Sequence, residues 1–333
     1  MKRIQWIDFC RSLAIFSVVV GHITMGLRNS PVIHTGYAFS LIQAYVYSFH
    51  IPLFFFISGF LYKKYLTWHS FGKNILKKFI VLGIPYVVFS AVMFALTNLS
   101  GGQARNVVKI QSLLSIWKQP IEYLWFLYVL FFIFVYIGLL QLIIKNDIYS
   151  SLLIILLAIL ASFLPNPSWI LREVPIWSLI FLSGCLIKRI INTPYFKVLG
   201  IFSGLIYVLY LCLLPNILGG KTINYTRISL IQLIVLLSAA LFITFIIKNT
   251  FRENKITNFI SKYGPITLVI YLVHMPLGSI TRIALIHIGL LNPEVHLIVG
   301  VLISFFGSVI VEWFVDKVKP LDFIFYPQRY LNL

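Results

Sequence analysis

The amino-acid sequence predicts an all-α, polytopic integral membrane protein with about ten transmembrane helices and both termini in the cytoplasm. Of its 333 residues, 60% are apolar and 11% are charged, whereas soluble domains are about 45–50% apolar and about 25% charged. The apolar residues form stretches long enough to cross a bilayer, and Lys and Arg collect in alternate connections between them. Such a chain cannot cover a globular surface with polar groups, so a soluble enzyme is excluded.

The spans follow from length, because a helix needs about 20 apolar residues to cross the hydrocarbon core. The two spans around residues 148–191 are the shortest and are flanked by prolines. We expect one membrane-embedded domain over residues 1–333, with an uncleaved first span. The predicted spans are 5–26, 40–62, 79–97, 122–144, 148–164, 175–191, 196–215, 229–247, 264–286 and 295–316.

The basic residues orient these spans, since cytoplasmic segments are enriched in Lys and Arg. With the N-terminus inside, 18 of the 27 Lys and Arg residues fall in inner segments, seven in outer segments and two within spans. The bias alternates from loop to loop, which predicts a multi-pass protein of the cell membrane with its lipid bilayer as surroundings.

The formal charge of +18 does not indicate nucleic-acid binding, because basic residues collect beside membrane spans and no compact basic domain is present. The three cysteines, Cys10, Cys185 and Cys212, lie in apolar runs without C-x-x-C spacing. We therefore expect no disulfide framework and no metal site.

Ionisable residues inside a span are costly and are usually functional. The first span carries Asp8, Arg11 and His22. Eleven residues make about three turns, so Arg11 and His22 lie about 20° apart around the helix and about 16 Å apart along it. Asp8 precedes Arg11 by three residues and can pair with it. A salt-bridged pair plus a packing histidine is the simpler alternative to a path across the membrane.

Polar residues in later spans are further candidates. His50 precedes Pro52, which frees a backbone carbonyl, and Ser58 with its following glycine lets another helix come close. His274 is likewise followed by a proline, and Arg282 lies eight residues later, about 80° around the helix. Each of these residues can equally serve helix packing.

Glu122 and Trp125 stand at the predicted outer start of the span 122–144, where an interfacial aromatic belt is the simpler interpretation. The catalytic signatures of soluble enzymes, such as G-x-S-x-G, H-E-x-x-H and the phosphate-binding glycine loops, are absent from the sequence.

Three stretches together resemble the membrane acyltransferase family 3, in particular its branch similar to fucose 4-O-acetylase. Residues 8–22, DFCRSLAIFSVVVGH, are similar to the family's D-x-x-R-G-L-A-I…H signature. Residues 49–60, FHIPLFFFISGF, are similar to its F-H-M-P-L-F-F-x-x-S-G-F, and residues 271–274, YLVH, to its late Y-L-x-H segment. The ten spans extend the resemblance over the whole chain.

The resemblance implies transfer of an acyl group, usually acetyl, from cytoplasmic acetyl-CoA or another acyl-CoA to a hydroxyl of an envelope carbohydrate or a small acceptor. Many members of the family carry an arginine-rich inner loop before the third span, where this chain has Lys73, Lys77 and Lys78. These lysines keep the charge for the phosphates of CoA but lose the bidentate fork of Arg.

The expected roles follow from acyl-transfer chemistry, which needs a base for the hydroxyl proton and donors for the oxyanion. Arg11 would hold the donor, oriented by Asp8, and His22 would be the general base or a transient acyl carrier. His50 and His274 would lie in the same cavity, where they would orient the acceptor or polarise the thioester carbonyl. The other expected residues of the acceptor cavity are Ser58, Glu122, Trp125 and Arg282.

Two other functions remain open on sequence alone. A transporter or flippase for a glycan or lipid-linked sugar would also need buried polar groups and a path across the membrane. A membrane-bound O-acyltransferase of another class would use a single histidine, such as His274, and would leave the Arg11–His22 pair without a purpose.

Overall fold

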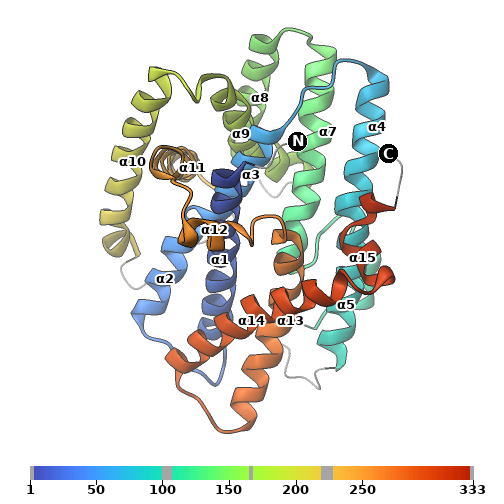
Figure 1. Ribbon diagram of the computed structural model, residues 1–333, viewed down its shortest axis with the longest axis vertical. Helices are drawn as coiled ribbons and strands as arrows, with labels where there is room; N and C mark the ends of the chain where they lie inside the picture. Colours follow the sequence, from blue (N-terminus) through green and yellow to red (C-terminus); the bar gives the residue numbers. More distant parts are fainter. Residues whose placement is uncertain (1–3, 100–106, 165–167, 219–227, 331–333) are drawn as a thin grey trace. The chain divides into compact units, whose positions relative to one another are not determined.

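The computed structural model describes residues 4–99, 107–164, 168–218 and 228–330, and all regular structure in these ranges is helical (Figure 1). Within them, nine helices or helical runs are long and apolar enough to cross a membrane. This confirms the predicted fold class. The nine are α1 (Gln5–Arg28), α2 with α3 (Tyr37–Leu61), α4 through α5 (Trp68–Leu99), α7 with its 3₁₀ turn (Glu122–Ile143), α9 (Trp169–Ile190), α10 (Pro194–Leu218), α11 (Leu230–Thr250), α13 (Thr267–His287) and α14 (Pro293–Val315).

The one remaining predicted span, 148–164, is present as a shorter helix, α8 (Asp147–Ser162). At 1.5 Å per residue, its 16 residues extend about 24 Å, less than the hydrocarbon thickness of about 30 Å. Three shorter helices complete the described chain: α6 (Ile110–Leu114), α12 (Lys255–Ser261) and α15 (Lys319–Phe325).

The second predicted span is broken into α2 (Tyr37–Tyr47) and α3 (His50–Leu61). Ser48 turns its hydroxyl back onto the Tyr45 carbonyl at 2.6 Å and also bonds the Tyr207 hydroxyl of α10 at 2.7 Å. Pro52 lacks an N–H, which is tolerated in the first turn of a helix. The break therefore places His50 at the beginning of a helix instead of in the middle of one.

The segment expected to be an inner loop before the third span is a helix instead. Lys73, Lys77 and Lys78 lie on α4 (Trp68–Lys78). Thr67 and Ser70 form a reciprocal capping box that starts this helix early. A π-helical segment, Phe79–Gly83, joins α4 to α5 (Ile84–Leu99) just before Pro85. Since proline removes a hydrogen bond and crowds the preceding turn, the wider π turn keeps the two segments continuous.

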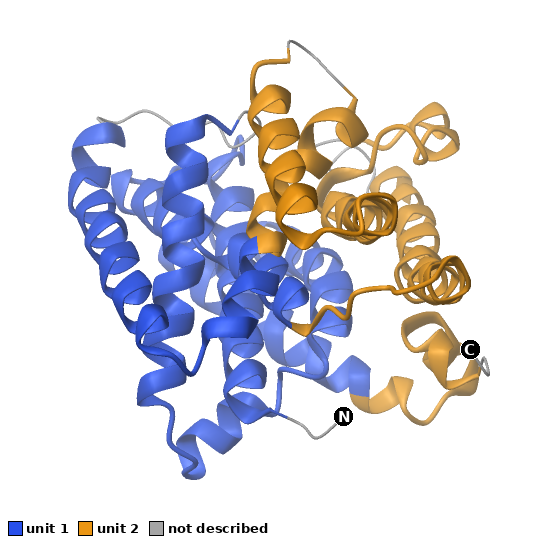
Figure 2. Cartoon of the chain, turned by 90° about the horizontal axis from the view of Figure 1, so that it is seen from above, with its two compact units in different colours: residues 1–60, 183–312 blue, residues 61–182, 313–333 orange. Residues whose placement is uncertain are grey.

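The chain forms two compact units, shown in different colours in Figure 2. The first unit comprises residues 1–60 and 183–312, and the second comprises residues 61–182 and 313–333. The expectation that residues 1–333 form a single domain stays a prediction.

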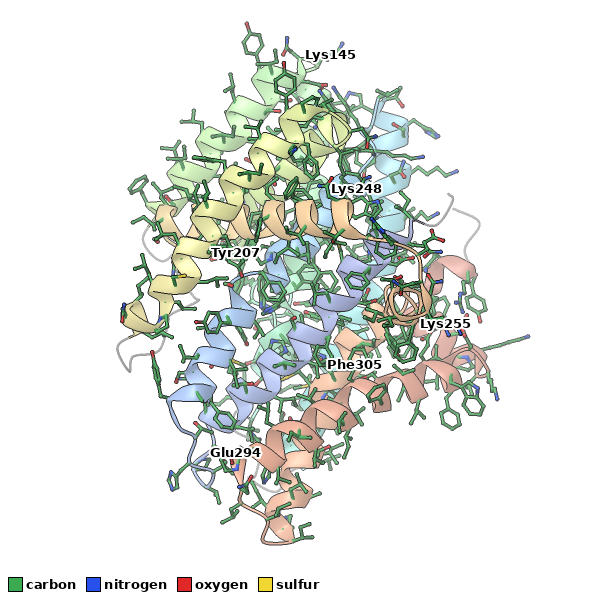
Figure 3. The ribbon with its side chains drawn as sticks, turned by 60° about the vertical axis from the view of Figure 1, so that its left-hand side comes forward. Lys145, Tyr207, Lys248, Lys255, Glu294 and Phe305 are labelled. Carbon is green, nitrogen blue, oxygen red and sulfur yellow. The ribbon has the colours of Figure 1, made fainter. Side chains whose placement is uncertain are left out.

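Helix α1 is the core of the first unit and contacts α2, α11, α12 and α13. Its buried residues lie around most of the helix, as expected for a span enclosed by other helices. Phe305 of α14 (labelled in Figure 3) packs edge-on against Phe16 of α1, with ring centroids 5.5 Å apart, and against Tyr263 at 5.0 Å. The polar residues of α1 are therefore held inside a packed bundle.

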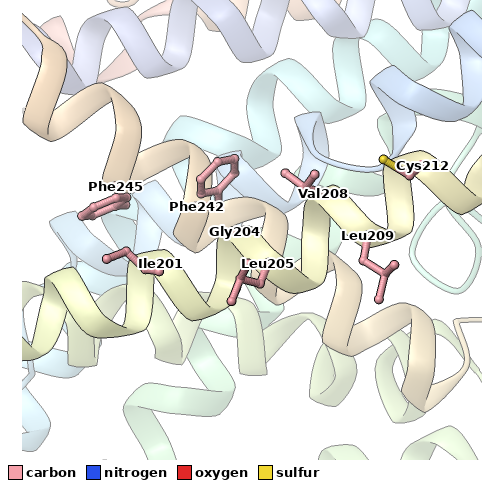
Figure 4. A pocket seen from close by; sticks show the side chains of 8 residues that line it. All are labelled: Ile201, Gly204, Leu205, Val208, Leu209, Cys212, Phe242 and Phe245. Atoms are coloured by element: carbon pink, nitrogen blue, oxygen red, sulfur yellow. The ribbon is translucent and has the colours of Figure 1, made fainter.

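Helices α10 and α11 pack along one another in the same unit. On their surface lies a hollow of about 530 Å³ (Figure 4), lined by Ile201, Gly204, Leu205, Val208, Leu209, Cys212, Phe242 and Phe245. Its lining is almost wholly apolar and offers no base or cation. The hollow therefore carries no side chain suited to acid–base catalysis or to binding an anion.

In the second unit, α7 (Trp125–Ile143) packs against α4, the π segment and α8, and α15 packs against α5. Lys64 pairs with Asp147 at the start of α8, and Tyr62 donates a hydrogen bond to Gln141 of α7 at 3.3 Å. These polar contacts stand at the end of α7 that the sequence predicts to face the cytoplasm.

Gly184 of α9 permits a close crossing with α3 in the first unit. A Cβ at this position would lie 2.0 Å from the Phe56 carbonyl oxygen and 2.8 Å from the Phe60 nitrogen. The Cys185 thiol next to it donates to the Gly59 carbonyl at 3.2 Å. Small residues let membrane helices approach closely, and the approach that the Ser58–Gly59 pair predicted is found here.

We expect Gly184→Ala to destabilise the protein by about 3 kcal/mol or more, because the new methyl meets backbone atoms that cannot rotate away. Thermal unfolding of purified protein in detergent measures the loss. Gly36→Ala is the matched control, since nothing lies within 4 Å of its Cβ position and its φ of −78° suits any residue. Equal melting temperatures for the two variants would contradict the close crossing.

Candidate acyl-transfer site

Arg11 and His22 lie on one uninterrupted helix, α1. The eleven-residue spacing therefore keeps its expected geometry, with the two side chains about 20° apart in direction and about 16 Å apart along the axis. The cavity that both residues are predicted to share is untested and stays a prediction.

Asp8 and Arg11 form an ion pair in the first turns of α1, with Asp8 Oδ1 3.9 Å from Arg11 Nη1. The Asp8 side chain is 7% exposed and that of Arg11 is 32% exposed. The Ser12 hydroxyl donates to the Asp8 carbonyl at 2.9 Å, and Ser261 of α12 donates to the Gln5 carbonyl at 3.4 Å. The acid is thus buried in the bundle, while the Arg11 side chain keeps part of its surface exposed.

His22 and His274 are brought together by α1 and α13. His22 Nδ1 lies 2.8 Å from His274 Nε2. The rings are nearly parallel, at 12°, with centroids 5.1 Å apart. His274 has no exposed surface, so a neighbouring helix encloses it fully. This contact joins residues that are 252 positions apart in the sequence.

The hydrogen-bond partners determine which nitrogen carries each proton. His274 Nδ1 lies 3.0 Å from the Ile270 carbonyl oxygen, and a carbonyl can only accept, so this nitrogen donates. In a neutral ring, which burial favours, His274 Nε2 must then accept, and His22 Nδ1 donates to it. The lone pair of the neutral His22 ring therefore resides on Nε2. This is the relation of a base to its orienting partner in hydrolase triads.

Tyr47 connects the third histidine to this pair. Its ring lies edge-on 4.9 Å from His50 and 6.2 Å from His22, measured between centroids. His50 is 1% exposed, and its Nδ1 donates to the Val46 carbonyl. A Cβ on Gly21 would come 2.8 Å from Tyr47 Cε2, so the glycine before His22 makes room for the aromatic ring.

Sequence reasoning missed Tyr47. Its signal was present, because Tyr47 precedes His50 by three residues and a glycine directly precedes His22. The break between α2 and α3 removed the helical register that would have linked Tyr47 to His50.

Arg282 of α13 reaches toward α1 one turn beyond His22. Its Nη1 donates to the Gly26 carbonyl at 3.0 Å. Since four residues advance a helix by about 40° and about 6 Å, Gly26 stands above His22 on nearly the same face. The Arg282 guanidinium is therefore held about one helical turn from His22, toward the helix end that the sequence predicts to be outside.

The contacts described above do not include the other predicted site residues. Ser58 is half-buried on α3, two turns after His50. The three lysines on α4, together with Glu122 and Trp125, belong to the second unit, where the Lys78 ammonium lies 4.3 Å from the centre of the Phe134 ring. Their predicted roles stay predictions.

The described cluster has the parts that acyl transfer to a hydroxyl requires. His22 provides a neutral imidazole with an oriented lone pair, His274 holds its tautomer, and Arg282 supplies a nearby positive charge. Arg11 provides a second cation on the same helix. A proton acceptor with cations on the same helix and on its neighbour is the set of groups that such a transfer would use.

Comparison with known proteins agrees with this chemistry. The family model described as an acyltransferase domain, that of acyltransferase family 3, matches residues 4–315. No curated protein and no solved structure matches the chain. The match includes His22, His274 and the nine membrane-spanning helices of the described residues. The chain is therefore a multi-pass membrane protein that belongs to acyltransferase family 3 and is an acyltransferase.

Proposed function

We propose that the protein is an O-acyltransferase that moves an acetyl or other acyl group from cytoplasmic acyl-CoA to a hydroxyl of an extracytoplasmic envelope glycan or related acceptor. The observation that carries the proposal is the hydrogen bond between His22 Nδ1 and His274 Nε2. It leaves the lone pair of His22 on Nε2, where a base for a hydroxyl proton is required.

The reaction balances with the groups present. The acceptor hydroxyl gives its proton to His22 Nε2 while its oxygen attacks the thioester carbonyl. The carbon–sulfur bond then breaks, and the imidazolium returns the proton to the leaving thiolate. Arg282, held one turn above His22, lies where a cation can stabilise the oxyanion. The alternative of a transient acyl group on His22 uses the same nitrogen.

Arg11 would bind the donor, because its side chain is partly exposed and lies near the helix end that the sequence predicts to be cytoplasmic. A guanidinium pairs well with phosphate. Asp8 would hold it in place from its buried position. The lysines of α4 would add positive charge for the phosphates of CoA, while the long pantetheine arm carries the thioester toward His22.

His50 and Arg282 would face the acceptor. His50 is linked to His22 through Tyr47, and Arg282 stands at the predicted outer end of α1. The bias of basic residues toward alternate loops supports the orientation, with both termini in the cytoplasm of a cell membrane.

The rival function of a glycan transporter is distinguished by thioester chemistry. Purified protein with radiolabelled acetyl-CoA should consume the thioester when an acceptor fraction from the cell envelope is added. A pure transporter would leave the thioester intact.

We expect His22→Ala to lower acyl transfer at least about 100-fold, because the base for the hydroxyl proton is lost. Release of CoA thiol by purified protein, with a melting curve as the folding check, measures this. His34→Ala, at an exposed histidine of the same unit, is the matched control. Normal turnover in His22→Ala would refute the role of the imidazole.

His274 acts through His22, so its substitution should change turnover more than binding. We expect His274→Ala to lower kcat at least about tenfold with little change in KM for acyl-CoA, because the tautomer of His22 is no longer held. His274→Gln keeps an acceptor near the Nε2 position and should restore part of kcat. Equal kcat in both variants would contradict a positioning role.

Arg11→Lys keeps the charge but removes the planar fork. We expect KM for acyl-CoA to rise about tenfold, which corresponds to about 1.4 kcal/mol, while KM for the acceptor stays nearly constant. Initial rates over a matrix of both substrates measure the two constants. Equal increases in both would argue against donor binding by Arg11.

A further inference from the structure

Three of the seven tryptophans of the chain form one cluster in the second unit, at the starts of α7 and α9. The Trp125 ring lies 5.9 Å from Trp169, at 32°, and 5.6 Å from Trp177, at 39°. Trp177 is 6% exposed, whereas Trp125 and Trp169 are half-buried. In an interfacial belt each ring faces lipid by itself. Here the rings contact one another and leave two of them partly accessible.

An ion pair lies on α9 between Trp169 and Trp177. Arg172 Nη1 is 3.7 Å from Glu173 Oε1, and their side chains are only 12% and 13% exposed. The Trp177 indole N–H donates to Glu173 Oε2 at 3.1 Å. Charged groups buried at the end of a membrane span are costly and are retained where they bind something.

The Glu173 carboxylate has capacity for further donors. It has about four lone-pair positions, and Arg172 Nη1 is too far from Oε1 for a hydrogen bond. A hydroxyl group that approaches Oε1 would therefore find an acceptor already aligned by the Trp177 indole.

Glu122 adds a second carboxylate beside the cluster. It is exposed and precedes Trp125 by three residues. Its φ of 42° is the one positive value of a non-glycine residue among the described ranges. A left-handed backbone is unfavourable for glutamate, and such conformations gather at functional sites.

We propose that Trp125, Trp169, Arg172 and Glu173, with Glu122 beside them, bind a neutral pyranose ring of a carbohydrate. A pyranose has an apolar face of C–H groups, which fits an indole, and a rim of hydroxyls, which fits a carboxylate and a guanidinium. The two carboxylates exceed the one cation, so a sugar acid or a phosphate would meet net negative charge. The inference deepens the proposed function by assigning residues that would hold a carbohydrate acceptor and by favouring a neutral sugar, and it rests on that function only for the purpose of the bound sugar.

The predicted position of the tryptophan cluster on the extracytoplasmic side of the membrane fits an envelope carbohydrate as the ligand. The starts of α7 and α9 are both predicted to be extracytoplasmic from the distribution of basic residues. A sugar bound there would be extracytoplasmic, as the proposed function requires of the acceptor.

The test is binding by the full chain in lipid nanodiscs to an array of neutral and uronic-acid-containing oligosaccharides, followed by calorimetry on the tightest neutral ligand. The protein carries His22→Ala, so transfer cannot consume the ligand. We expect neutral oligosaccharides to bind and the uronic-acid forms to bind more weakly. Trp169→Ala should weaken binding about fivefold or more through the lost ring contact.

Matched variants separate recognition from folding. Trp169→Phe keeps an aromatic face and should restore most of the affinity, and Glu173→Gln keeps the shape but should weaken binding. Trp117→Ala removes a tryptophan that is 64% exposed and lies outside the cluster, and it should leave the affinity unchanged. Melting curves confirm that each variant is folded.

The outcomes distinguish this inference from the proposed function. Absence of binding to every neutral oligosaccharide, preference for the uronic-acid forms, or equal affinity of Trp169→Ala and Trp117→Ala would overturn the carbohydrate site. If the His22→Ala protein binds neutral sugar but the protein with His22 intact consumes no acyl-CoA, the proposed transfer is lost while the carbohydrate site stands.

Discussion

The hydrogen bond between His22 Nδ1 and His274 Nε2 is the contact on which the proposed chemistry depends. It joins the first span to the late helix α13 and orients an imidazole that would otherwise be free to rotate. The Ile270 carbonyl fixes the proton of His274, and this proton in turn determines the acceptor role of His274 Nε2. Through His274, the Ile270 carbonyl therefore determines which nitrogen of His22 carries the lone pair.

Burial of this pair is possible because α1 is enclosed on most sides. In a bilayer, a polar side chain that faced lipid would lack hydrogen-bond partners. The bundle supplies partners from its own backbone: the Val46 carbonyl for His50, the Ile270 carbonyl for His274 and the Gly26 carbonyl for Arg282. The same enclosure that makes the fold stable also keeps the imidazoles oriented.

The two units divide the polar groups between them. The histidine cluster and the Asp8–Arg11 pair belong to the first, while the tryptophan cluster with its Arg172–Glu173 pair belongs to the second. The function proposed above requires one surface for a nucleotide-linked donor and another for a hydroxyl acceptor. Each charged pair is neutral as a whole, which lowers the cost of keeping its two charges near the end of a membrane span.

The sequence by itself determined the fold class, because hydrocarbon thickness sets the length of each apolar stretch and the cost of charge in lipid sets where the basic residues lie. It also determined the relation of Arg11 to His22, since a continuous helix has a fixed turn. Tertiary structure alone decided the partner of His22, the place of Tyr47 and the helical state of the α4 lysines. Those features depend on contacts between distant segments, on a helix break at Ser48 and on a capping box at Thr67, and none of these is encoded in hydropathy or periodicity.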